Sequence, residues 1–161
     1  MKPFHYSAER VLDAPAELIY HCLSDYREHH RASTSGGFLP PAFTDLQVLR
    51  GGVGAGTTIR FTAVLGGRAS TRTQDISEPE PGRVLVEWGD GEGSTFTVEP
   101  RGERTLLRIE TVLNARGLEG VALHLFGARL LKPLYEDELS SLERYAQEHA
   151  RAPHQVSARS A

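Results

Sequence analysis

The chain has 161 residues, of which 39% are hydrophobic and 24% charged, and its 18 basic and 21 acidic residues give a net charge of −3. This composition is ordinary for one globular domain, and the lack of any run of like charges argues against a nucleic-acid partner. A single cysteine excludes an internal disulfide and favours a reducing, cytoplasmic setting, and no apolar run predicts a signal peptide or an integral membrane segment.

The N-terminal part of the chain predicts one strand followed by two short helices. Residues 4–12 carry β-forming side chains in partial alternation, which is typical of a strand. Residues 13–24 place apolar side chains at helical spacing after a proline in the first turn, and residues 25–33 predict a second short helix. The glycines and prolines of residues 34–41 then indicate a loop.

The hydrophobic pattern changes to period two between residues 43 and 114. Six alternating segments are separated by short turns, which predicts an antiparallel meander and, with the first strand, a sheet of about seven strands. The six segments are residues 44–50, 57–65, 68–77, 83–89, 94–100 and 104–114.

The stretch "GGVGAGT" at residues 51–57 looks at first like a loop that holds a phosphate. A phosphate-binding loop needs a lysine after its glycines and a helix that opens beside it, but this stretch has no lysine and leads into a predicted strand. The glycines therefore predict a turn or bulge with positive φ between two strands.

Residues 118–149 predict one long amphipathic helix, kinked at Pro133, and residues 151–161 predict a disordered tail. The apolar face of a sheet must be buried, and this helix is the only long amphipathic partner. The fold class is therefore α+β: a curved antiparallel sheet wrapped around a C-terminal helix, with residues 1–150 as a single domain and a cavity between sheet and helix. The predicted inward stripe of the helix is Val121, Leu125, Ala128, Tyr135, Leu139, Leu142 and Ala146.

Five stretches carry a resemblance to a known superfamily: "VLDAPAELIYHCLSDY", "GGVGAGTTIRF", "EPEPGRVLVEW", "TLLRIET" and "LLKPLYEDELSSLERYAQ". Together, over about residues 4–149, they resemble the START-like (SRPBCC) superfamily of polyketide cyclases/dehydrases, bacterial lipid-carrier relatives and birch-pollen-allergen-like proteins. The resemblance implies a helix-grip fold with an internal pocket for an apolar or amphipathic small molecule. Members share a cavity and no catalytic motif, so the resemblance implies the fold more strongly than a reaction.

The concave face of the predicted sheet supplies half of the candidate ligand-binding residues, and the long helix supplies the rest. Alternation places Glu87, with Arg60, Arg108 and Glu110, on the convex and solvated face. The residues expected on the concave face are Ile59, Phe61, Ala63, Val84, Val86, Trp88, Phe96, Val98, Leu107 and Ile109. The ligand-binding candidates are Phe61, Ala63, Trp88, Phe96, His124, Leu125, Ala128 and Tyr135.

No residue pattern identifies a catalytic machinery. His124 and Tyr135 are the best candidates for an acid or base in the pocket, although the simpler interpretation is a satisfied histidine at the edge of the core and a packed tyrosine. The histidines of "EHH" (28–30) lack a ligand cluster at regular spacing and are expected to face solvent, so no metal site and no cofactor are predicted. Cys22 on an apolar helix face is expected to be an inert core thiol.

Two functions fit these observations. The first is binding of a lipid-, polyketide- or quinone-like small hydrophobic ligand by a monomer or homodimer. The alternative is a polyketide cyclase/dehydrase-type enzyme that uses a pocket acid or base, so the sequence leaves open whether the chain is an enzyme. A third interpretation, a groove for another protein, lacks support because the sequence offers no exposed apolar helix.

Overall fold

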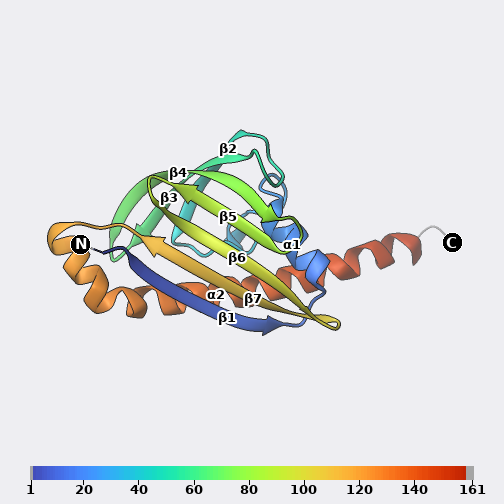
Figure 1. Cartoon of the computed structure of the whole chain (residues 1–161). Helices are drawn as coiled ribbons and strands as arrows, with labels where there is room; N and C mark the ends of the chain where they lie inside the picture. Colours follow the sequence, from blue (N-terminus) through green and yellow to red (C-terminus); the bar gives the residue numbers. More distant parts are fainter. Residues whose placement is uncertain (1, 159–161) are drawn as a thin grey trace.

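The computed structural model describes residues 2–158 as one curved sheet wrapped along a long C-terminal helix (Figure 1). The sheet has seven antiparallel strands in the order β1-β7-β6-β5-β4-β3-β2. The strands are β1 (Phe4–Leu12), β2 (Phe43–Arg50), β3 (Thr58–Leu65), β4 (Arg68–Glu80), β5 (Val84–Gly89), β6 (Glu92–Arg101) and β7 (Arg104–Leu113). The helices are α1 (Ala16–Ser24) and α2 (Gly117–Ala158), with one 3₁₀ turn, η1 (Ser33–Ser35). The predicted α+β fold and the predicted number of strands are confirmed.

The region between β1 and β2 contains one α-helix where the sequence predicts two. The chain leaves helical geometry at Asp25, which bridges Val53, and the Tyr26 N–H donates to the Gly52 carbonyl at 2.9 Å. The Asp25 carboxylate also accepts the N–H groups of Arg27 and Glu28, both at 3.1 Å. These bonds to a loop and to a side chain replace most of the helical ladder, so the chain after α1 forms turns at residues 26–29 instead of a second helix.

Strand β5 faces the opposite way from the prediction. Leu85 pairs with Phe96 and is fully buried, and Glu87 pairs with Ile76 on the same inward side. Trp88 is 41% exposed, and Val84 and Val86 are half-buried. In "VLVEW" large apolar residues occupy both parities, so the alternation is ambiguous and the pairing with neighbouring strands decides which face is buried. The prediction that Val84, Val86 and Trp88 face the cavity is wrong.

The loop "GGVGAGT" turns the chain from β2 to β3, as predicted, and also docks on the end of α1. The Gly54 N–H donates to the Ser24 carbonyl at 2.8 Å, and the Ala55 N–H donates to Glu78 Oε2 at 2.9 Å. Gly54 has a φ of +61°, and a Cβ there would lie 2.6 Å from Glu78 Oε2. Gly56 has a φ of +86° with open space around it.

Replacing Gly54 by alanine is expected to lower the free energy of unfolding by about 2–4 kcal/mol. Left-handed backbone costs an L-residue about 1–2 kcal/mol, and the displaced Glu78 side chain loses its bond to Ala55. Gly56→Ala is the matched control, because it carries the backbone cost without the clash. Urea denaturation of both variants checks the difference, and equal losses would contradict it.

The N-terminal half of α2 is rotated relative to the predicted stripe. Gly127 is buried against β1, because a Cβ there would meet the Phe4 ring at 2.7 Å, and Leu131 continues the inward face. Small residues let the helix approach the strand closely, whereas the prediction took the large apolar residues as the inward ones. Val121, Leu125 and Ala128 therefore lie outside, and the predicted inward position is wrong for all three.

The same rotation exposes large apolar side chains on α2. Leu118 is 89% exposed, Leu125 68% and Phe126 52%, so the expectation that the chain has no exposed apolar helix is wrong. From Tyr135 onward the predicted stripe is confirmed, with Leu139, Leu142 and Ala146 buried. The helix extends to Ala158 instead of residue 149, and residues 159–161 of the predicted tail lie outside the described residues. No helix among residues 2–158 has the length and apolar content needed to cross a membrane.

Candidate functional site

A cavity of about 80 Å³ lies between the concave face of the sheet and α2. A water molecule needs roughly 10–15 Å³ of such space, so the cavity holds a few waters. The lining residues come from α1, the loops before β2, six of the strands and α2: Leu23, His30, Leu39, Phe43, Leu46, Ile59, Phe61, Ala63, Leu65, Arg72, Gln74, Glu87, Gly93, Ser94, Phe96, Thr111, Leu113, Leu131, Leu134, Tyr135 and Glu138. The predicted cavity between sheet and helix is present.

Half of the predicted ligand-binding residues line this cavity. Phe61, Ala63, Phe96 and Tyr135 do so, and their contact with a ligand stays a prediction. Trp88, His124, Leu125 and Ala128 are absent from the lining, because β5 and the first half of α2 face the other way.

His124 has a structural environment of its own outside the cavity. Its Nδ1 donates to the Gly120 carbonyl of the same helix at 2.8 Å, and its ring meets Phe4 edge-on at 5.7 Å between centroids. The alternative of a satisfied histidine at the edge of the core therefore describes it. Of the two predicted acid–base candidates, only Tyr135 lies at the cavity.

The cavity lining divides into an apolar and a polar group. Among the apolar lining residues, Phe43, Leu46, Leu65, Leu113 and Leu134 are half-buried. The polar lining residues are His30, Arg72, Gln74, Glu87, Ser94, Thr111, Tyr135 and Glu138. A molecule in this space would meet both hydrocarbon and hydrogen-bonding groups.

Glu87 brings a carboxyl group from β5 into the cavity. The Tyr26 hydroxyl, itself almost fully buried, donates to Glu87 Oε1 at 2.6 Å. Burial raises the pKa of Glu87 to about 7, and the bond from Tyr26 opposes this rise only in part. Glu87 therefore exchanges its proton near neutral pH.

Glu138 brings a second carboxyl group from α2, one turn beyond Tyr135. Its side chain is buried, and burial raises its pKa to about 8, with further contributions from the charges of Glu87 and Asp137. Near pH 7 Glu138 is thus mostly protonated beside a half-ionised Glu87. Two carboxyl groups in such different states can serve as a proton donor and a proton acceptor.

Hydroxyl groups continue this polar surface on β6, β7 and α2. The Tyr135 hydroxyl bonds to Thr111 Oγ1 at 2.5 Å, and Thr111 Oγ1 bonds to Ser94 Oγ at 2.8 Å. Burial first, and then the charge of Glu138, raises the pKa of Tyr135 to about 12. The Tyr135 hydroxyl therefore stays protonated at physiological pH.

Gln74 and His30 offer hydrogen-bond acceptors to a ligand. Gln74 Oε1 is buried and has no partner among the described residues. His30 Nε2 donates to the Leu23 carbonyl at 2.8 Å, which leaves Nδ1 as an acceptor, and burial lowers the pKa of His30 to about 4. An unpaired buried amide oxygen costs about 1–3 kcal/mol, which a ligand hydroxyl would recover.

His29 and His30 point in different directions, as their adjacency predicts, but neither faces solvent. His29 is 7% exposed and contacts the C-terminal half of α2, whereas His30 is half-buried at the cavity. The expectation of solvent-facing histidines is wrong. Bonds to Tyr145 and to the Leu23 carbonyl hold them inside.

The two acidic residues of the site, Glu87 and Glu138, were not predicted from the sequence. Glu138 carried a usable signal, because it follows the inward Leu134 and Tyr135 at helical spacing. Glu87 carried no such signal, because charged residues are expected on a solvated face and the parity of β5 is ambiguous.

Comparison with known proteins agrees with this architecture. The family model described as polyketide cyclase/dehydrase and lipid transport matches residues 3–147. Among solved structures, the KanY protein is 20% identical with a TM-score of 0.74, covering 91% of this chain and 99% of that chain. TTHA0849 from Thermus thermophilus is 21% identical with a TM-score of 0.69 and coverages of 91% and 99%. The Zhui aromatase/cyclase from Streptomyces sp. R1128 is 16% identical with a TM-score of 0.68 and coverages of 94% and 98%. A search of curated proteins found no significant match.

Proposed function

Because the chain belongs to the polyketide cyclase/dehydrase and lipid-transport family, we propose that it binds an amphipathic small molecule between the sheet and α2. The observation that carries this proposal is a cavity lined by both apolar and polar side chains, with the unpaired Gln74 oxygen among its polar groups. Burial of the apolar part of the ligand supplies affinity, and its hydroxyl or carbonyl groups bond to the polar lining groups. Lipid-, polyketide- and quinone-like molecules have this character.

Binding of such a ligand requires the cavity to widen. Small-molecule sites are typically about 300–1,000 Å³, whereas this cavity is about 80 Å³. Phe43, Leu46 and Leu134 are half-buried lining residues that can change rotamer without uncovering the central core. These side chains would move aside as the ligand enters.

Replacing Ala63 by leucine is expected to weaken binding of the amphipathic probe 1-anilinonaphthalene-8-sulfonate at least tenfold. Ala63 is buried and lines the cavity, so the added carbons occupy the space that the probe needs. Val64→Leu is the matched control, because the adjacent residue faces outward and is 39% exposed. Fluorescence titration measures both, and thermal unfolding checks that both variants fold.

An equal loss in the two variants, or none in either, would place the probe elsewhere, for example on the exposed face of α2. Native mass spectrometry of protein purified from its own host is the companion measurement. A retained molecule that dissociates from the wild type and is missing from the Ala63→Leu protein identifies the ligand class.

A second function, acid–base catalysis on a bound carbonyl compound, is favoured by Glu87 and Glu138. The carboxylate of Glu87 can accept a proton from a carbon next to a carbonyl, while Glu138 or the Tyr135 hydroxyl donates a hydrogen bond to the carbonyl oxygen. Aldol cyclisation and dehydration both need this pair of roles. The similar fold of an aromatase/cyclase makes the reaction class reasonable without assigning it.

A further inference from the structure

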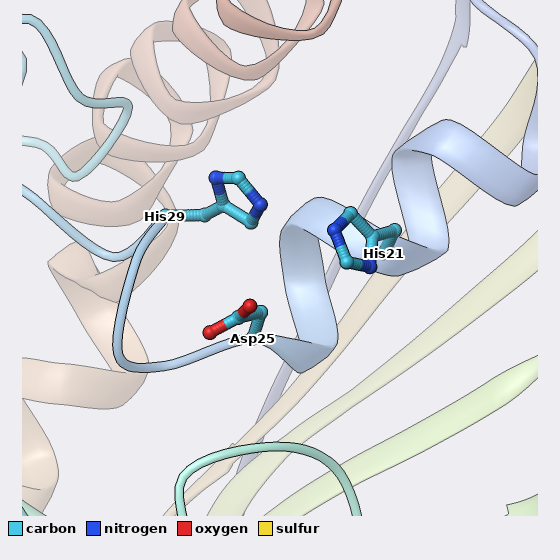
Figure 2. Close-up of side chains that lie close together, drawn as sticks. All are labelled: His21, Asp25 and His29. Carbon is cyan, nitrogen blue, oxygen red and sulfur yellow. The ribbon is translucent and has the colours of Figure 1, made fainter. Parts of the chain in front are cut away.

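A second polar cluster lies on the far side of the segment that follows α1, outside the cavity. His21, Asp25 and His29 each offer one ligand atom, and these atoms all lie within 4.8 Å of one another. Figure 2 shows the His29 ring and the Asp25 carboxylate on the same side of the chain as the His21 ring. None of the three side chains lines the cavity.

The backbone brings the three residues together at intervals of four. The Asp25 N–H donates to the His21 carbonyl at 3.2 Å, and the His29 N–H donates to the Asp25 carbonyl at 3.3 Å. α1 ends at Ser24 and Asp25 itself is extended, but these two bonds span the bend and hold His29 near His21. His21, Asp25 and His29, which are four residues apart in the sequence, therefore lie close together in space.

The cluster is partly buried and its members are held in position. Asp25 is 8% exposed and His29 7%, and Asp25 Oδ1 is fixed by the backbone N–H groups that it accepts. No hydrogen bond or ion pair among residues 2–158 joins the three side chains to one another. The three ligand atoms therefore converge without bonding to one another, and the His21 and His29 rings meet edge-on at 5.0 Å between centroids.

Tyr145 on α2 orients the His29 imidazole in the manner of a second coordination shell, and His149 lies beside it. His29 Nδ1 lies 2.5 Å from the Tyr145 hydroxyl, so a ring that donates there presents the lone pair of Nε2. His149 Nδ1 donates to the Tyr145 carbonyl at 3.0 Å, and its ring centroid is 5.3 Å from that of His29. Histidine ligands of metals commonly donate their other ring N–H in this way.

We propose that His21, Asp25 and His29 form a binding site for a divalent transition metal of the Zn²⁺ type. Two imidazole nitrogens and a carboxylate oxygen are a usual ligand set for this ion, with metal–ligand distances of about 2.0–2.2 Å. Tetrahedral geometry then requires ligand atoms roughly 3.3 Å apart. The exposed side chain of His21 supplies the movement that closes the site, and water or His149 takes the fourth position.

The bound metal would fasten the segment after α1 to the C-terminal half of α2. His29 belongs to that segment and bonds to Tyr145 of α2, while the adjacent His30 reaches the cavity. The role inferred for the metal is therefore structural. It does not depend on the proposed function, because its ligands are separate from the cavity lining.

Isothermal titration of the full chain with ZnCl₂ tests the site. The wild type is expected to bind one Zn²⁺, and both His21→Ala and Asp25→Asn are expected to weaken binding at least tenfold. Asparagine keeps an oxygen for the N–H groups of Arg27 and Glu28, and His21 is exposed, so both variants retain the fold. His5→Ala, which removes an exposed histidine of β1, is the matched control and is expected to leave the affinity unchanged.

Two results would overturn the proposal: a wild type that binds no Zn²⁺, or binding that survives in both site variants. Substitution with Co²⁺ supplies a readout of the ligand type. Nitrogen and oxygen ligands give visible d–d bands without a thiolate charge-transfer band, whereas a charge-transfer band would assign the metal to Cys22 and contradict the site. The affinity for 1-anilinonaphthalene-8-sulfonate is measured in parallel. It is expected to be the same in the wild type, His21→Ala, Asp25→Asn and His5→Ala.

Discussion

Replacing Glu138 by glutamine is expected to raise the free energy of unfolding at pH 9 by about 3–5 kcal/mol and to leave it nearly unchanged at pH 4. Burial raises the pKa of Glu138 from 4.5 to about 8, and each pKa unit corresponds to about 1.4 kcal/mol. The wild type must hold an ionised carboxylate in its core at pH 9, whereas glutamine is neutral at every pH. At pH 4 the wild-type carboxyl is protonated in both states, so the two proteins differ little.

The direction follows from proton binding in the two states. Between about pH 4.5 and pH 8 the folded protein holds a proton on Glu138 that the unfolded chain has lost, so stability falls as the pH rises through this window. Glu87, with a pKa of about 7, acts in the same direction. His30, with a pKa lowered from 6.5 to about 4, acts in the opposite direction and removes stability as the pH falls below 6.5.

Urea denaturation of the wild type and Glu138→Gln at pH 4, 7 and 9 measures the contribution of Glu138, including its coupling to Glu87, since the other titrating groups are common to both proteins. Glu136→Gln is the control, because this residue is two positions away on α2 and exposed. It is expected to follow the wild-type pH dependence. Parallel curves for the wild type and Glu138→Gln would mean that Glu138 is not a buried acid in the folded protein.

The fold could be predicted because its signals are local. Alternation over β3 and β7 and the glycines of the tight turns specify the meander without reference to the rest of the molecule. The long amphipathic run of α2 then has only the sheet as a partner. These features depend on neighbours in the sequence, and the structure confirms them.

The errors in the site have one common cause, the assumption that large apolar residues face inward. On β5 this assumption led to the prediction that Trp88 faces inward and Glu87 outward, whereas the reverse is observed. On α2 it led to the prediction that Leu125 faces inward, whereas Gly127 does. Cross-strand pairing and the close approach of Phe4 decide these orientations, and neither can be seen in one sequence. Because β5 has the orientation opposite to the predicted one, Glu87 lines the cavity and adds a carboxyl group to its polar lining.

The cluster of His21, Asp25 and His29 was not predicted for a different reason. The partners of His29 lie four and eight residues earlier, across the predicted boundary between two helices. Two backbone bonds across the bend at Asp25 bring these residues together, and the sequence does not indicate these bonds. Spacing alone would have shown the pattern had the segment been read as one continuous unit.

Replacing Glu87 by glutamine is expected to slow proton exchange at the carbon next to the carbonyl of a bound ketone by about 10²–10⁴-fold, if the cavity performs acid–base chemistry. General bases contribute about this much, and Glu87 is the cavity carboxyl that is substantially ionised near pH 7. Deuterium incorporation into 2-tetralone, followed by NMR in D₂O, measures the rate. The wild-type rate is expected to rise as the pH increases through about 7 and then to level off, because the carboxylate is the active form.

Glu110→Gln is the matched control, because Glu110 lies on the exposed convex face of β7 and is expected to leave the rate unchanged. Fluorescence titration with 1-anilinonaphthalene-8-sulfonate separates chemistry from binding, since glutamine keeps an oxygen that can accept the hydrogen bond from Tyr26. Loss of exchange with affinity retained within a few fold identifies Glu87 as the base. If the wild type exchanges no faster than buffer while it binds the probe, the cavity holds its ligand without transforming it, and the polar groups then serve recognition alone.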